Sequence, residues 1–229
     1  IDGIYKALIQ LGVKENNRIL EPAMGTGNFF GFMPSEISSS AKLYGVELDN
    51  ITGQIAKKLY PNANVQIKGF EKTTFSDNQF DIVVGNVPFG AYSVHDSEYN
   101  KYNFYIHDYF LAKSIDKLKP NGIMAVITSS GTMDKQSPKT RKYLADRAEL
   151  LGAIRLPNTA FKQTAGTEVV ADILFFQKRE EKIDANLESD SWIGTGENSQ
   201  GFVLNNYFIE HPEMVLGSLV EERGLYGAI

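Results

Sequence analysis

Residues 21–28 read Glu-Pro-Ala-Met-Gly-Thr-Gly-Asn, and this stretch directly follows a short β-like run at 18–21. Two glycines at such a place permit a tight turn from a strand into a helix, and they let the backbone approach a ligand closely. Glycine pairs also occur in purely structural turns, so the choice between a binding turn and an ordinary turn depends on the segments that follow.

Those segments alternate between β-like runs and helical patterns, which is typical of a mostly parallel sheet covered by helices on both faces. We expect strands at 18–21, 42–47, 64–68, 80–85 and 123–128, the last preceded by a turn at 120–122. We expect helices at 51–60, 104–118 and from 137 to about 147. Runs at 150–156 and 169–177 predict an antiparallel hairpin at the edge of a seven-stranded α/β sheet.

Glu47 ends the second predicted strand, about 20 residues after Gly27, where nucleotide-binding α/β folds place the acid that accepts ribose hydroxyls. The glycine turn lacks the Gly-Lys-Ser/Thr ending of a phosphate loop and begins with an acid, Glu21. A phosphate ligand is therefore disfavoured against an adenosine that carries a cationic group. S-adenosylmethionine fits that description.

A second motif, Asn86-Val87-Pro88-Phe89, follows the fourth predicted strand. The amino nitrogen of adenine is a poor nucleophile because its lone pair is delocalised into the ring. The side-chain oxygen of Asn86 and the main-chain carbonyl of Val87 can each accept one amino hydrogen, while the Phe89 ring offers a surface for the base. The alternative is an ordinary proline turn after a strand, and the two preceding signals favour the chemical interpretation.

Together these motifs resemble those of the amino-methylating DNA methyltransferases, whose first motif reads Asp/Glu-Pro-x-x-Gly-x-Gly and whose catalytic motif reads Asp/Asn/Ser-Pro-Pro-aromatic. The chain is most similar to modification subunits of type I restriction systems and to the methylase regions of large methylase-helicase proteins of mobile elements, over residues 3–179. The resemblance implies a Rossmann-like methyltransferase fold and methyl transfer from S-adenosylmethionine to N6 of adenine in DNA. It also implies a cytoplasmic protein with a helicase-like or specificity region elsewhere in the full-length chain.

The resemblance also assigns the site residues. The expected catalytic residues are Asn86, Val87, Pro88 and Phe89. Phe161 is expected to be the second aromatic side chain that stacks on the flipped base. The expected cofactor-binding residues are Glu21, Pro22, Ala23, Gly25, Thr26, Gly27, Asn28, Phe29, Glu47, Leu48, Phe70, Glu71 and Asn86.

Two positions depart from the family pattern. Val87 replaces the first proline of the catalytic motif, although any residue supplies the carbonyl needed there. Phe70 occupies the place of an acid that binds the adenine amino group of the cofactor in many relatives, so that contact could pass to Glu71 or be replaced by stacking.

Composition excludes several other functions. The chain has no cysteine, which removes disulfides, thiolate zinc sites and the nucleophile that 5-methylcytosine chemistry needs. Its three histidines lack metal-ligand spacing, so we expect no metal. No apolar stretch approaches the roughly 18 residues that span a bilayer, so we expect no membrane partner.

Charge divides the chain into two parts. Residues 180–229 hold ten acids and two bases, against 18 acids and 21 bases before them. We therefore expect a catalytic domain at 1–179 that binds DNA, followed at 180–229 by an acidic linker and the start of a further region. Lys135, Lys139 and Arg141 are candidate phosphate contacts, although a basic helix face is often simply solvated.

Two other functions stay open at this point. Glutamine in protein and adenine in RNA present a similar planar amino group, so the catalytic motif alone does not separate these acceptors from DNA. A degenerate module that binds the cofactor or DNA without turnover is the non-enzymatic alternative, suggested by Val87, Phe70 and the acidic balance. The chain begins with Ile1 rather than Met, and we expect it to be a piece of a longer protein.

Overall fold

The computed structural model describes residues 1–162, 166–220, 223–224 and 227–228. Seven strands form one sheet in the order β3-β2-β1-β4-β5-β7-β6, and every strand except β7 runs in the same direction. The strands are β1 (Arg18–Glu21), β2 (Lys42–Glu47), β3 (Asn64–Ile67), β4 (Phe80–Asn86), β5 (Leu118–Ser129), β6 (Ala148–Leu156) and β7 (Ala171–Lys178). The predicted α/β fold with an antiparallel edge hairpin is confirmed.

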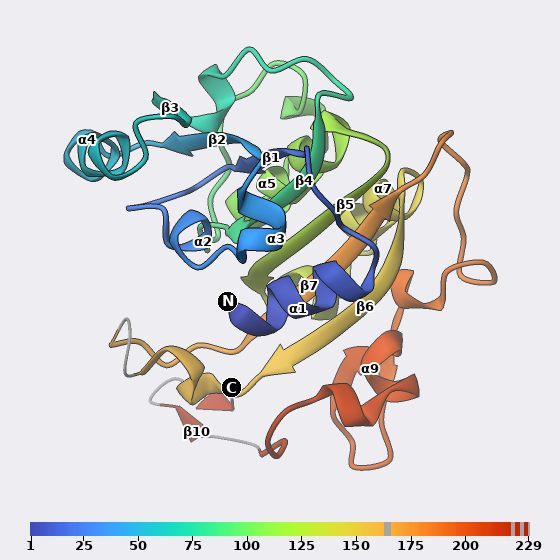
Figure 1. Cartoon of the computed structure of the whole chain (residues 1–229). Helices are drawn as coiled ribbons and strands as arrows, with labels where there is room; N and C mark the ends of the chain where they lie inside the picture. The colour runs from blue at the N-terminus through green and yellow to red at the C-terminus, as the bar shows by residue number, and fades with distance from the viewer. Residues whose placement is uncertain (163–165, 221–222, 225–226, 229) are drawn as a thin grey trace.

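Helices cover both faces of this sheet (Figure 1). The helix α1 crosses the face turned toward the viewer, and α5 and α7 lie behind the sheet. The helices are α1 (Asp2–Gln10), α2 (Asn28–Gly31), α3 (Ser35–Ser38), α4 (Asn50–Leu59), α5 (Ile106–Lys117), α6 (Gly131–Asp134), α7 (Lys139–Ala145) and α9 (Asn206–Glu210). Within the described residues no helix has the length and apolar character needed to cross a bilayer.

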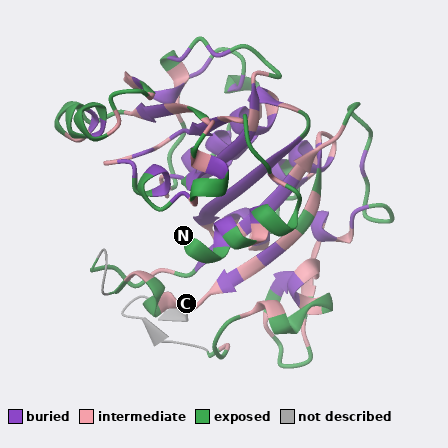
Figure 2. Cartoon of the chain, in the orientation of Figure 1, coloured by how far each residue is buried: buried purple, intermediate pink, exposed green. Residues whose placement is uncertain are grey.

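Alternation along the strands supplies both halves of the core. Ile82 and Val84 pack into the cluster on the α1 side, whereas Val83 between them packs into the cluster on the α5 side. Because both faces are covered, the middle parts of the central strands are apolar and buried, as the purple strands of Figure 2 show. The ends of the strands are therefore the part of the sheet that can form a functional site.

The strand β5 begins earlier than expected. The turn predicted at 120–122 is instead an irregularity inside the strand, because the pairing with β4 shifts from Phe80 opposite Leu118 to Ile82 opposite Ile123. Asn121 absorbs the extra length in a left-handed conformation, with φ of 64°. The other predicted strands and helices lie within about two residues of those observed.

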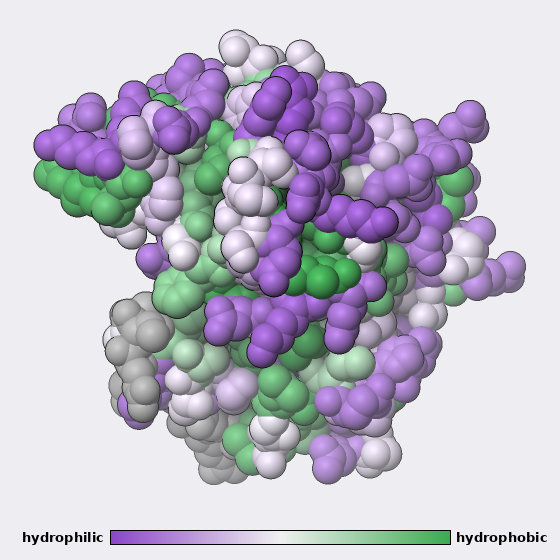
Figure 3. Space-filling view, in the orientation of Figure 1, coloured by the Kyte–Doolittle hydropathy of each residue, from purple (hydrophilic) through white to green (hydrophobic). Residues whose placement is uncertain are grey.

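The helix α4 packs only part of its apolar surface against the sheet. Ala56 is fully buried against the sheet, whereas Ile55 is 44% and Leu59 58% exposed. Figure 3 shows an apolar patch on the surface over this helix. Helical spacing identified the helix correctly but did not distinguish the buried stripe from an exposed one beside it.

Residues 185–208 are not a free linker, so this part of the domain prediction is wrong. Trp192, Ile193 and Phe208 are at most 5% exposed and join the same core as α5 and α7. A short hairpin of β8 (Thr195–Glu197) and β9 (Val203–Asn205) follows, and the Asn205 side-chain amide donates to the carbonyls of Met133 (2.9 Å) and Trp192 (2.7 Å). A few apolar residues anchor the segment despite its polar composition. Residues 221–222, 225–226 and 229 of the predicted following region lie outside the described residues.

We expect Trp192→Ala to lower the free energy of unfolding by about 3–5 kcal/mol, the usual cost of truncating a buried aromatic side chain. The matched control is Leu187→Ala, because Leu187 lies in the same segment and is 59% exposed. Its cost should stay below about 1 kcal/mol. Urea unfolding followed by circular dichroism measures both, and equal small effects would contradict the packing of this segment.

Candidate active site

The sheet order reverses at β1, whose neighbours β2 and β4 lead away in opposite directions. Ligands of open α/β sheets bind in the crevice that such a switch creates at the carboxyl ends of the strands. The glycine turn leaves β1 there, Glu47 ends β2, and Asn86 ends β4. The fold thus brings the three motifs that the sequence singled out to one edge of the sheet.

The glycine turn needs glycine for two reasons. Gly25 and Gly27 have φ of 56° and 87°, in the left-handed region that side chains disfavour. The Tyr60 hydroxyl donates to the carbonyl of Gly27 at 2.7 Å, and a Cβ atom on Gly27 would lie 2.4 Å from Cε2 of that ring. The turn is therefore held closely against the end of α4.

The Glu47 carboxylate joins the first two strand ends. One oxygen accepts the backbone N–H of Gly25 and the other accepts that of Asp49, both at 2.8 Å. These bonds fix the carboxylate at the mouth of the crevice. Each carboxylate oxygen can accept more than one hydrogen bond, so capacity for a ligand hydroxyl remains.

Glu21 is the most unusual charged group of the site. Its side chain is 2% exposed, and its Oε2 atom has no hydrogen-bond partner among the described residues. Burial raises the pKa of this carboxyl well above its ordinary value, although the backbone N–H of Phe29 opposes the rise. Nearby Glu47 adds to it. Burial without a partner for Oε2 therefore favours the protonated form of this carboxyl.

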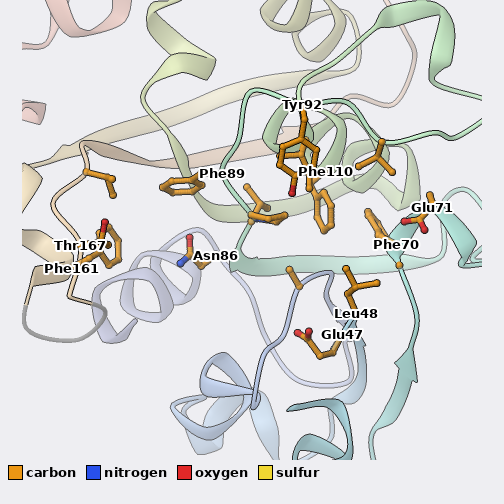
Figure 4. A pocket seen from close by; sticks show the side chains of 17 residues that line it. Glu47, Leu48, Phe70, Glu71, Asn86, Phe89, Tyr92, Phe110, Phe161 and Thr167 are labelled. Atoms are coloured by element: carbon orange, nitrogen blue, oxygen red, sulfur yellow. The ribbon is translucent and has the colours of Figure 1, made fainter. Parts of the chain in front are cut away.

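A cavity of about 750 Å³ opens along these strand ends. Phe70 and Glu71 lie at one end, Phe161 and Thr167 at the other, and Asn86 between them (Figure 4). Glu71 folds back so closely that a Cβ on Gly69 would meet its carboxylate at 2.1 Å. The cavity therefore has an acidic, aromatic end and an opposite end that Phe161 and Thr167 line.

The catalytic tetrapeptide continues the sheet. The backbone N–H of Val87 donates to the carbonyl of Ile127 on β5 at 3.0 Å, and the Val87 side chain is buried in the core. Asn86 is exposed at the cavity, and Pro88 and Phe89 line it. The substitution of valine for proline therefore leaves the loop anchored.

Most expected site residues line the cavity. They are Ala23, Glu47, Leu48, Phe70, Glu71, Asn86, Val87, Pro88, Phe89 and Phe161. The others lie in or beside the glycine turn without lining it, namely Glu21, Pro22, Gly25, Thr26, Gly27, Asn28 and Phe29. Phe29 in particular is 4% exposed and packs its ring against Tyr5, so its side chain belongs to the core.

The sequence did not identify the rest of the lining. It consists of Gly69, Tyr92, Val94, Ile106, Phe110, Thr167 and Val169. Tyr92 and Val94 lie in an irregular loop, where no periodic pattern marks a position as functional. Phe110 carried only the helical spacing of a core residue.

The candidate phosphate contacts divide three ways. Arg141 is fully buried, donating from Nε to the carbonyl of Ile193 (2.7 Å) and from Nη1 to that of Thr132 (3.1 Å). The prediction that it touches DNA is therefore wrong, because its position on the helix faces the core. Lys135 is 24% exposed and is paired with buried Asp108, whereas Lys139 is exposed.

This sheet, with its reversal at β1 and a glycine turn after that strand, has the fold of S-adenosylmethionine-dependent methyltransferases. Within this class the assignment is narrower. The chain belongs to the N-6 DNA methylase family, whose model matches residues 3–194.

Individual relatives agree with this family. The chain is 34% identical over 185 residues to Defense against restriction protein B of Escherichia phage P1, a match that covers 77% of this chain and 8% of that protein. It is 27% identical over 191 residues to the Type I restriction enzyme EcoEI methylase subunit of Escherichia coli, covering 72% of this chain and 39% of the subunit. The chain therefore corresponds to less than half of either relative.

The fold matches that of the type I restriction-modification methyltransferase subunit from Streptococcus thermophilus, with a TM-score of 0.63 at 19% identity. The match covers 76% of this chain and 42% of that one. At this identity the likeness concerns the fold alone.

We expect Glu21→Gln to stabilise the free protein at neutral pH. A carboxyl whose folded pKa lies above its unfolded value costs stability as pH rises through that interval, so the advantage of the amide should grow as pH rises above the ordinary carboxyl pKa. Thermal unfolding across this range measures the difference. The control is Glu36→Gln at an exposed position, which should show no such trend. If the difference in thermal stability between Glu21→Gln and wild type stays the same at every pH, the raised pKa is contradicted.

Proposed function

We propose that this chain transfers a methyl group from S-adenosylmethionine to the N6 amino group of adenine in DNA, as the methylase part of a larger protein. The single observation that carries this proposal is the position of Asn86-Val87-Pro88-Phe89 at the end of β4, lining the same cavity as Glu47 and Phe70. Membership of the N-6 DNA methylase family supports the choice of acceptor.

The residues present fit the cofactor. A cavity of about 750 Å³ lies within the usual range for small-molecule sites, and acids are placed for a ligand with hydroxyls and positive charge. Glu47 would accept ribose hydroxyls, while the exposed side chain of Leu48 would pack against the adenine. Phe70 is only 1% exposed and forms the wall behind this end of the cavity. When bound, S-adenosylmethionine supplies an electrophilic methyl group.

The chain's own residues would activate the acceptor. The Asn86 side-chain oxygen and the Val87 carbonyl would accept the two amino hydrogens and draw the nitrogen toward tetrahedral geometry, an interaction that strengthens as positive charge develops on it. The proton released after transfer would pass to water. The mechanism therefore depends on positioning and hydrogen-bond acceptance rather than on a general base.

A base inside a duplex cannot reach this cavity, so the target adenine would have to flip out at a cost of a few kcal/mol. Stacking on an aromatic ring returns about 1–3 kcal/mol per base. Phe89 and Phe161 line the cavity on the side away from Phe70 and are the proposed stacking surfaces (Figure 4). Lys139, and Lys135 if it exchanges Asp108 for phosphate, are the proposed backbone contacts.

Target selection would reside elsewhere in the full-length protein. The relatives extend well beyond the matched part, and we propose that a helicase-like or specificity region supplies the DNA sequence preference. The catalytic domain proposed at 1–179 would then work together with the packed segment 185–208.

The test is a methyl-transfer assay with labelled S-adenosylmethionine, offering duplex DNA, RNA and protein to the full chain in parallel. We expect label in DNA, recovered as N6-methyladenine after digestion. Label in RNA or in protein glutamine would assign another acceptor. Cofactor binding by calorimetry without label in any substrate would identify a module without turnover.

We expect Asn86→Ala to lower the rate of methyl transfer by about 10²–10³-fold. Removal of one comparable hydrogen-bonding group from the active sites of other enzymes has an effect of this size. Cofactor affinity should change little, because this acceptor acts on the target base. Single-turnover kinetics and calorimetry measure the two quantities. Exposed Asn62→Ala is the control, and an equal loss of cofactor affinity in Asn86→Ala would refute the assigned role.

A further inference from the structure

Lys113 on α5 is a buried lysine beside the cavity, only 3% exposed. Its ammonium donates to the carbonyl of Phe70 and to the Asp96 carboxylate, each at 2.9 Å. The same nitrogen lies 5.1 Å from the centroid of the Phe70 ring, within cation–π range. The Thr73 hydroxyl also donates to the Phe70 carbonyl, at 2.7 Å, so this peptide is held from two sides.

Asp96 is the anchor of a second segment, the loop that joins β4 to α5. Its backbone carbonyl accepts the N–H groups of Tyr99 and Asn100, at 2.9 and 2.8 Å, and its carboxylate accepts the Tyr109 hydroxyl at 2.7 Å. Burial would raise the pKa of Asp96, but the hydrogen bonds from Lys113 and Tyr109 outweigh burial and hold the pKa below its ordinary value. The Asp96 carboxylate and the Lys113 ammonium form a buried ion pair at 2.9 Å.

The two partners of Lys113 belong to two different walls of the cavity. Phe70 and Glu71 form the wall after β3, and the loop anchored by Asp96 carries Tyr92 and Val94. Figure 4 shows Phe70 and Tyr92 on neighbouring sides of the opening. We propose that Lys113, paired with Asp96, is a positioning residue that sets the separation of these two walls and thereby the affinity for the cofactor.

Stability alone does not explain why Lys113 and Asp96 are buried as an ion pair. Desolvation of two buried charges is so costly that well-packed apolar replacements are often equally stable. An apolar side chain would fill the volume without fixing the direction of the Phe70 carbonyl relative to the loop. One ammonium with acceptors from both segments does fix it, because its hydrogen bonds are directional.

Lys117 provides a matched comparison on the same helix. It is one turn further along α5, is 6% exposed and pairs with Asp77 at 2.6 Å. The Asp77 side chain is 67% exposed, and neither residue lines the cavity. The two lysines are similar in burial and charge but join different parts of the molecule.

The inference rests on the proposed function, since it takes the cavity to be the S-adenosylmethionine site. The experiment compares Lys113→Met with Lys117→Met in the full chain. Calorimetry with S-adenosylmethionine should give a dissociation constant raised about tenfold or more for Lys113→Met, and within about twofold of wild type for Lys117→Met. With duplex DNA, KM for the cofactor should rise while kcat at saturation stays within a few-fold.

Hydrogen exchange supplies a readout that needs no cofactor. Backbone amides of residues 70–73 and 96–100 should exchange faster together in Lys113→Met, and at the wild-type rate in Lys117→Met. If Lys113→Met does not fold, Asp96→Asn keeps the shape and removes the carboxylate charge. It should raise the dissociation constant about three- to tenfold and loosen the same two segments.

The outcomes separate the inference from the proposed function. If wild type binds cofactor and the two lysine variants bind it equally well, or equally poorly, the positioning role is overturned. Exchange that rises in only one of the two segments also overturns it. If wild type does not bind S-adenosylmethionine, the proposed function fails, and hydrogen exchange still decides whether Lys113 couples the two walls.

Discussion

The pairing of β1 with β4 is the constraint on which the site depends. Only Ile19 with Ile82 and Leu20 with Val83 are in register, yet this short contact places the end of the first strand beside the end of the fourth. Since β2 pairs on the other edge of β1, the sheet order must reverse there. The cavity lies along the strand ends on both sides of this reversal.

Charge in the cavity follows the same layout. Glu47 and Glu71 line it and Glu21 lies behind the glycine turn, whereas no lysine or arginine is among its described lining residues. Lys113 approaches the wall but is neutralised by Asp96. The cavity therefore favours a cationic ligand over an anionic one, in agreement with the absence of a phosphate-loop lysine in the turn itself.

The sequence predicted those parts of the site whose chemistry depends on residue type at a strand end. Glycine at 27 and asparagine at 86 indicate a functional role at a strand end, which a hydrophobic residue there would not. The strands before them were recognisable by their length and composition. Tyr92 could not be predicted, because its place depends on a loop held by Asp96 and Lys113 across the fold. The burial of Arg141 and of the segment that contains Trp192 could not be predicted for one shared reason. Arg141 donates to the carbonyl of Ile193, the neighbour of Trp192, and contacts between such distant parts of the chain leave no local pattern.

The hydrogen bond from Val87 to Ile127 has a dynamic consequence. A proline at this position, as in the related motif, has no N–H to donate, and the Ile127 carbonyl would need another donor. With valine, the first peptide after Asn86 is an added rung of the β4–β5 ladder. Its amide should then open only when the sheet end opens, so the acceptor carbonyl next to the target base would be as rigid as the core rather than as mobile as a loop.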